Sequence, residues 1–180
     1  IKNAADISIA TIPVDERDAP EFGILKSNEA GMITAFIEKP KKDVLPEWVS
    51  DTGAEMQKKG KHYLASMGIY IFSKQVLYQL LNEVHPDATD FGKEIIPNSI
   101  LTYKVASYQY EGYWTDIGNI YSFFEANLSL TEDIPPFNLF DNTKTVYSRA
   151  RMLPPAKISG TTLEKTVIAE GSIINASRIE

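Results

Sequence analysis

The longest apolar strand pattern in this chain is Leu64-Ala65-Ser66-Met67-Gly68-Ile69-Tyr70-Ile71-Phe72. A long apolar run of this kind is typical of a β-strand in the centre of a sheet. Ser73 follows at once, and serine is a preferred residue at the N-terminus of a helix. The apolar residues that come after it at helical spacing are Val76, Leu77, Leu80 and Leu81. The stretch therefore predicts a central strand that leads into an amphipathic helix.

The segments on either side continue this alternation of strands and helices. Further strands are predicted at Ile7–Val14, Phe22–Lys26, Met32–Ile37 and Val105–Tyr110. The turn Asn28–Gly31 joins two of them into a hairpin, because its glycine suits a positive φ. Asp90 and Asp116 are expected to cap two further helices. Strands that alternate with helices as far as residue 130 predict an α/β layered domain.

The end of the chain has a different periodicity. Val167, Ile173 and Ile179 are spaced six residues apart, which is typical of a parallel β-helix in which each short strand stacks on the one before. A single closing β-strand with chance spacing is the alternative. Stacks of this kind usually need about three or more repeats, and roughly two are present here. We therefore expect the chain to be a fragment of a longer protein.

These patterns divide the chain into three parts. Residues 1–132 are expected to form the α/β domain, and residues 157–180 the start of the β-helix. Between them, residues 133–156 contain four prolines and little periodicity, which indicates a linker.

Composition excludes several classes of function. The 180 residues include 24 acidic and 18 basic ones, for a net charge of −6, so a nucleic-acid partner is not expected. There is no cysteine, which excludes disulfides, thiolate nucleophiles and iron–sulfur clusters. No apolar run approaches the length of a membrane span, and we expect no signal peptide. We expect no membrane contact and a cytoplasmic location.

Three short segments contain residues that could carry chemistry. In Phe36–Pro40, Glu38 could accept hydrogen bonds from sugar hydroxyls and Lys39 could hold a phosphate, although a solvated strand end would look the same. Asp116, after Trp114, could bind Mg²⁺ through one oxygen or simply cap a helix. The small residues around Ser66 could admit a ligand to the strand or only allow close helix packing.

Taken together and in order, the motifs resemble the ADP-glucose pyrophosphorylase family, the glucose-1-phosphate adenylyltransferases. The motifs are Ala19–Gly23, Phe36–Pro40, Ala65–Tyr70, Asp90–Pro97, Tyr113–Gly118 and Leu153–Lys157. The resemblance extends from about Ala5 to the end of the chain. It implies the C-terminal half of a Rossmann-like nucleotidyltransferase domain, followed by the start of a left-handed parallel β-helix.

The resemblance also implies a reaction and its residues. ATP and glucose 1-phosphate would give ADP-glucose and pyrophosphate, with Mg²⁺ as cofactor. The implied catalytic residues are Lys39, which would pair with the sugar phosphate, and Asp116, which would hold the metal. The implied substrate-binding residues are Gly23, Glu38, Lys39, Ser66, Asp90, Phe91 and Trp114.

Within that set, each residue has an implied task. Glu38 and Ser66 would hydrogen-bond the sugar hydroxyls, and Gly23 would let the backbone approach the sugar. Trp114 would form a wall of the pocket, and Asp90 with Phe91 would lie on a nearby loop.

Two features of the family are missing from these residues. Its glycine-rich nucleotide loop and a second metal-binding aspartate precede the region that the chain matches, so we expect the 180 residues alone to be inactive. The full-length protein is expected to form a homotetramer and to serve bacterial glycogen synthesis. Another sugar-nucleotide pyrophosphorylase, or a non-catalytic regulatory subunit or scaffold of the same fold, remains an alternative.

Overall fold

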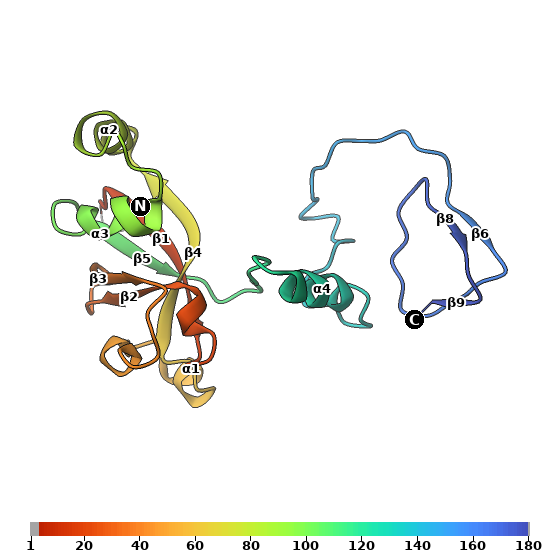
Figure 1. Ribbon diagram of the computed structural model, residues 1–180, viewed down its shortest axis with the longest axis horizontal. Helices are drawn as coiled ribbons and strands as arrows, with labels where there is room; N and C mark the ends of the chain where they lie inside the picture. The colour runs from red at the N-terminus through yellow and green to blue at the C-terminus, as the bar shows by residue number, and fades with distance from the viewer. Residues whose placement is uncertain (1–3, 180) are drawn as a thin grey trace. The chain divides into compact units, whose positions relative to one another are not determined.

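A computed structural model describes residues 4–179, which form two compact units, one ending at Glu111 and the other starting at Gly112 (Figure 1). The first unit is built on a five-stranded sheet of order β3-β2-β4-β1-β5. Its strands are β1 (Ile7–Val14), β2 (Gly23–Ser27), β3 (Ile33–Glu38), β4 (Tyr63–Phe72) and β5 (Val105–Gln109). The predicted central strand is confirmed as β4, which pairs with both β1 and β2. All pairings are antiparallel except that of β1 with β5.

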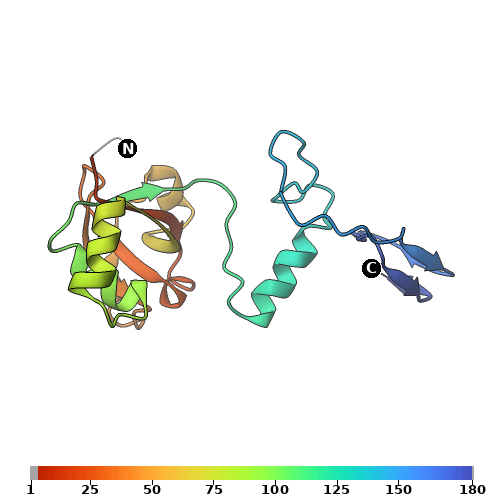
Figure 2. The same cartoon turned by 90° about the horizontal axis from the view of Figure 1, so that it is seen from above.

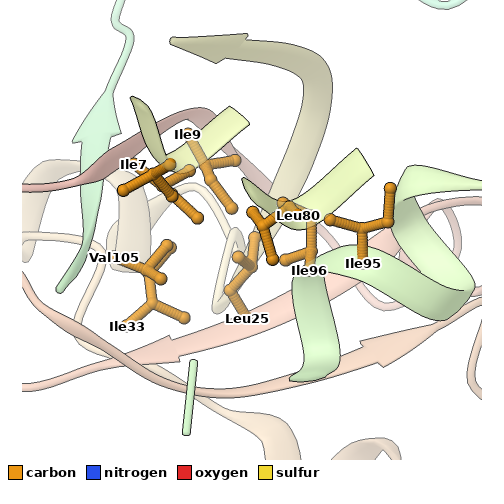
Figure 3. Packing of buried hydrophobic residues seen from close by; sticks show 9 residues of the cluster. Ile7, Ile9, Leu25, Ile33, Leu80, Ile95, Ile96 and Val105 are labelled. Carbon is orange, nitrogen blue, oxygen red and sulfur yellow. The ribbon is translucent and has the colours of Figure 1, made fainter. Parts of the chain in front are cut away.

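Helical segments cover one face of this sheet. Figure 2 shows α2 (Lys74–Gln79) and the turn η3 (Leu80–Val84) in front of the strands. The turn η4 (Phe91–Ile95) and helix α3 (Ile96–Ser99) complete the cover. The core beneath them consists of Ile7, Ile9, Leu25, Ile33, Val76, Leu80, Ile95, Ile96 and Val105 (Figure 3). Burial of each such large side chain stabilises the fold by about 1.5–3 kcal/mol.

A second cluster of buried side chains lies around the N-terminal end of β4. It consists of Val14, Ala19, Ile24, Leu45, Tyr63 and Ala65. Two short 3₁₀ helices, η1 (Ala19–Glu21) and η2 (Leu45–Trp48), contribute to it. Helix α1 (Ala54–Lys58) has no buried residue. Without an apolar stripe, its five residues leave no periodic signal in the sequence.

The central strand contains a bulge where it pairs with β1. Tyr70 lies opposite Ile9 and Ser66 opposite Thr11, so residues 67–69 face the single residue Ala10. Gly68 has a φ of +70° there, a conformation that glycine adopts at little cost. The bulge therefore lies between Ser66 and Tyr70 on β4.

Two of the predicted helix caps need correction. Ser73 occupies the position before α2, but its side chain makes no capping hydrogen bond. Asp116 does not open the helix expected after it: α4 spans Ile120–Ser129, and the side chain of Asn119 accepts a hydrogen bond from the Ser122 amide at 2.8 Å. Aspartate and asparagine cap helices about equally well, so sequence alone did not choose between them.

The second unit contains short parallel strands near the end of the chain. Strand β6 (Lys157–Ser159) pairs with β8 (Ile173–Asn175), and β7 (Thr162–Leu163) pairs with β9 (Arg178–Ile179) (Figure 1). Parallel stacking of successive coils is thus confirmed. Each strand stacks on the second strand before it, however, and not on the one immediately before as the six-residue period suggested.

Candidate active site

The end of β3 places the first two candidate residues. Glu38 is the last residue of β3 and pairs with Gly23 on β2. Lys39 follows with a φ of +46°, and its amide donates a hydrogen bond to the Phe22 carbonyl at 3.0 Å. A left-handed backbone at a residue other than glycine costs roughly 1–2 kcal/mol and is frequent at functional sites. The two adjacent charged residues are therefore presented by a strained turn at the end of a strand.

The Glu38 carboxylate lies between two glycines. A Cβ atom built on Gly23 would come within 2.8 Å of Glu38 Oε2, and one built on Gly92 within 2.9 Å of the same oxygen. The Gly23 position would also clash with the Phe36 ring. Both glycines thus leave room for the carboxylate, which would have to shift if either position carried a side chain. The structure gives Gly23 this role, and its approach to a sugar stays a prediction.

Ser66 and three aromatic rings lie in the same region. Ser66 is buried, and its Oγ accepts a hydrogen bond from the Gly68 amide at 3.3 Å. The Tyr70 ring, four residues along β4, stacks on Phe91 with 5.9 Å between ring centroids and 21° between planes. Phe72 packs against Phe91 as well, at 5.7 Å. Phe91 is thereby fixed against the central strand.

The electrostatics link three of these side chains. Burial raises the pKa of Glu38, and the nearby Asp90 carboxylate raises it further, while Lys39 and Lys93 act in the opposite direction. Burial also raises the pKa of Tyr70; a hydrogen bond with Ser66 lowers it, and the charges of Glu38 and Asp90 raise it. Two carboxylates and a phenol therefore share one polar region at the edge of the core.

The structure brings together six of the predicted site residues: Gly23, Glu38, Lys39, Ser66, Asp90 and Phe91. Trp114 and Asp116 belong to the second unit and lie in the segment that precedes α4. Their placement in the same pocket stays a prediction, as do the individual roles of all these residues.

Two residues of the site were missed from the sequence. Tyr70 lies in an apolar run, where an aromatic residue is most simply explained as part of the core. Gly92 stands in a turn, where glycine is common for local reasons. The available signal was their place inside two of the motifs that carry the family resemblance, Ala65–Tyr70 and Asp90–Pro97.

The one candidate metal ligand fits magnesium only with help from a substrate. Asp116 is exposed, and its Oδ2 accepts a hydrogen bond from the Gly118 amide at 3.2 Å. Among residues 4–179 no three or more acidic or histidine side chains are grouped so that they could hold a metal ion. One carboxylate, completed by phosphate oxygens and water, is a usual way for proteins to hold Mg²⁺.

Within the part of the chain that the structure describes, no helix has the length and apolar character that crossing a bilayer requires.

Comparison with known proteins identifies both parts of the chain. A nucleotidyl transferase family model matches residues 1–133, and a GLGC left-handed parallel beta-helix domain model matches residues 151–180. The glucose-1-phosphate adenylyltransferase small subunit of Triticum aestivum, described as chloroplastic/amyloplastic, is 42% identical over 181 residues. The alignment covers 97% of this chain but 38% of that relative, so the chain spans well under half of its length.

These matches confirm the resemblance to ADP-glucose pyrophosphorylases and the fold that it implied, a nucleotidyltransferase domain followed by a left-handed β-helix. The chain belongs to the nucleotidyl transferase family.

Proposed function

We propose that this chain is the sugar-phosphate-binding part of a glucose-1-phosphate adenylyltransferase, which converts ATP and glucose 1-phosphate to ADP-glucose and pyrophosphate. The observation that carries the proposal is the Glu38 carboxylate, held between the backbone at Gly23 and Gly92 and followed directly by Lys39. Glu38, an acceptor for sugar hydroxyls, and Lys39, a cation for a phosphate, are thus adjacent at the end of β3. The 42% identity to the wheat adenylyltransferase small subunit supports the same function.

The chemistry asks little covalent work of the protein. A phosphate oxygen of glucose 1-phosphate attacks the α-phosphorus of ATP, the bond to the β,γ-diphosphate breaks, and pyrophosphate leaves. The rate then depends on alignment of the two phosphates and on neutralisation of their charge. In this scheme the Lys39 ammonium pairs with the sugar phosphate as a compact point charge.

Other residues orient the sugar. Glu38 and Ser66 accept hydrogen bonds from its hydroxyls, and the Tyr70 phenol, which is beside Ser66, adds a further donor. The ring of Trp114 would close the pocket. Mg²⁺ held by Asp116 and by phosphate oxygens would supply further charge neutralisation.

Two alternatives to this function remain, and the name of the wheat relative bears on the first. Its name describes a small subunit; for this chain, the first alternative is a regulatory subunit or scaffold without turnover. Another sugar-nucleotide pyrophosphorylase, with a different base or sugar, is the second alternative. Each alternative can be told from the main proposal by the product, because a scaffold forms no sugar nucleotide and another pyrophosphorylase forms one other than ADP-glucose.

Several broader expectations remain proposals. We propose a tetrameric full-length protein and a role in glycogen synthesis in a bacterial cytoplasm, although the wheat relative is described as plastid-located. The inactivity of the 180 residues alone also stays a prediction. Turnover by the purified chain above that of Lys39→Ala would contradict it.

The proposal is tested by product formation in the full-length protein. We expect ADP-glucose from glucose 1-phosphate and ATP–Mg²⁺, and a loss of at least about 100-fold in kcat for Asp116→Asn. Glu111→Gln, an exposed carboxylate five residues away, serves as the control and should be unchanged. Faster turnover with another nucleoside triphosphate would support a different pyrophosphorylase. No turnover with any triphosphate would support the regulatory-subunit alternative.

A further inference from the structure

The loop that carries Asp90, Phe91 and Gly92 is held by a glutamate that the proposed chemistry does not use. Glu94 Oε1 accepts hydrogen bonds from the Thr89 amide at 3.0 Å, the Asp90 amide at 3.0 Å and the Thr89 hydroxyl at 3.2 Å. One carboxylate oxygen therefore fixes the backbone on the entry side of the loop.

Asp90 completes the arrangement from the other side. Its Oδ1 accepts a hydrogen bond from the Lys93 amide at 2.9 Å. Asp90 and Glu94 thus form a reciprocal cap, in which each side chain accepts from a backbone amide at the other end of the turn. The helical turn η4 has five residues, too few to be stable on its own, so its shape depends on such contacts.

This turn lies against Glu38, at the end of β3. Gly92 leaves only enough room for Glu38 Oε2, at 2.9 Å from where a Cβ would be. Phe91 stacks on Tyr70, and the Asp90 charge acts on both Glu38 and Tyr70. A small displacement of the turn would alter all three contacts at once.

We propose that Glu94 is a positioning residue, which holds the turn so that Asp90 and Gly92 lie beside Glu38 and Phe91 lies against Tyr70. Glu94 itself touches no part of the substrate and acts through Thr89 and Asp90. The ligand class rests on the proposed function, which assigns Glu38 and Lys39 to a sugar phosphate. The effect of Glu94 on the pKa of Glu38 does not rest on the proposed function, because this effect is present without any ligand.

The first arm of the test is free of ligand. Carbon-13 NMR of the 180-residue chain follows the titration of the Glu38 carboxyl, assigned by its loss in Glu38→Gln. In Glu94→Ala the pKa of Glu38 is expected to fall towards its ordinary value, because a displaced turn exposes Glu38 and removes the Asp90 charge from it. Glu94→Gln keeps an oxygen acceptor and should restore most of the shift.

Two further variants guard the result. Glu83→Ala removes an exposed glutamate from the neighbouring turn η3 and should leave Glu38 unchanged. If Glu94→Ala does not fold, Glu94→Asp keeps the charge but shortens its reach. It should then lower the pKa of Glu38 in the same direction.

The second arm is binding of glucose 1-phosphate to the full-length protein. We expect roughly tenfold weaker binding in Glu94→Ala, recovery in Glu94→Gln, and unchanged binding of ATP. An unchanged pKa of Glu38 in Glu94→Ala and Glu94→Asp would overturn the inference. A lowered pKa with no binding of glucose 1-phosphate by any variant would support the inference and contradict the proposed function.

Discussion

The two units of the chain hold their apolar residues in different ways. In the first unit, strand β1 buries Ile7 and Ile9 completely against the helical layer. In the second unit, no residue of α4 is buried, and Ile173 of strand β8 is 81% exposed. The alternating and helical patterns of apolar residues in the first unit thus correspond to a core that the first unit forms by itself. The six-residue pattern of the second unit belongs to a stack, in which burial comes from neighbouring coils.

This contrast predicts the largest difference between matched substitutions. Ile96→Ala, in the core of the first unit, should lower the free energy of unfolding by about 2–5 kcal/mol, because it leaves a cavity in a fully buried site. Ile173→Ala should change it by about 0.5 kcal/mol or less. Urea unfolding followed by circular dichroism measures both. Equal losses would show that the second unit has a core of its own.

A clash at Gly92 should give the next largest effect. Gly92→Ala would place a methyl group 2.9 Å from Glu38 Oε2, closer than a carbon and an oxygen normally approach without a bond. The clashing oxygen is the end of a flexible side chain that can turn aside, so we expect a loss of at most about 1 kcal/mol in the free energy of unfolding, measured by the same urea titration.

The matched control for Gly92→Ala is the same substitution in a Glu38→Ala background. Most of the loss should then disappear, because the clashing carboxylate is gone. A double-mutant cycle with no coupling between the two positions would show that the effect of Gly92→Ala does not depend on the Glu38 side chain.

A smaller effect concerns pH. The pKa of Glu38 is raised in the folded chain, mainly by burial, so the folded state binds this proton more tightly than the unfolded state does. The ionised side chain therefore reduces stability above its folded pKa, and this penalty is absent below about 4.5, the ordinary value. Glu38→Gln should gain at most about 1 kcal/mol at pH 7, discounted for partial exposure, and nothing near pH 4.

Unfolding of Glu38→Gln and the parent chain at both pH values checks this sign. Glu47→Gln, an exposed carboxylate on the short helix η2, is the comparison. A gain for Glu38→Gln that is larger at pH 4 than at pH 7 would contradict a raised pKa.

Much of the first unit could be predicted because its signals are local. The apolar run ending at Phe72 indicated the central strand, and alternation at Ile7 and Ile9 indicated its neighbour. The cap of α4 could not be predicted in the same way, because Asp116 and Asn119 are both good cap residues. The backbone decides between them, and it places Asn119 where its side chain accepts the hydrogen bond from the Ser122 amide.

The candidate site was predictable only in part. Glu38 and Lys39 stood out because a carboxylate and a cation follow a strand and precede a proline. The contact of Glu38 with Gly92 joins residues far apart in the sequence, and it depends on how the turn η4 packs against β3. No spacing in the sequence encodes such a contact. Tyr70 was missed for the same reason, since its partners become neighbours only through the bulge in β4 and the packing of η4.

The most direct test of the sugar-phosphate assignment is calorimetric titration of the full-length protein with glucose 1-phosphate and, separately, with ATP–Mg²⁺. Lys39→Ala is compared with Lys41→Ala, an exposed lysine two residues further along. We predict that Lys39→Ala weakens binding of glucose 1-phosphate by about 1.5–3 kcal/mol and spares ATP, while Lys41→Ala changes neither. Equal effects of the two variants, or no binding of glucose 1-phosphate by the parent protein, would contradict the assignment of Lys39 and its neighbours to a sugar phosphate.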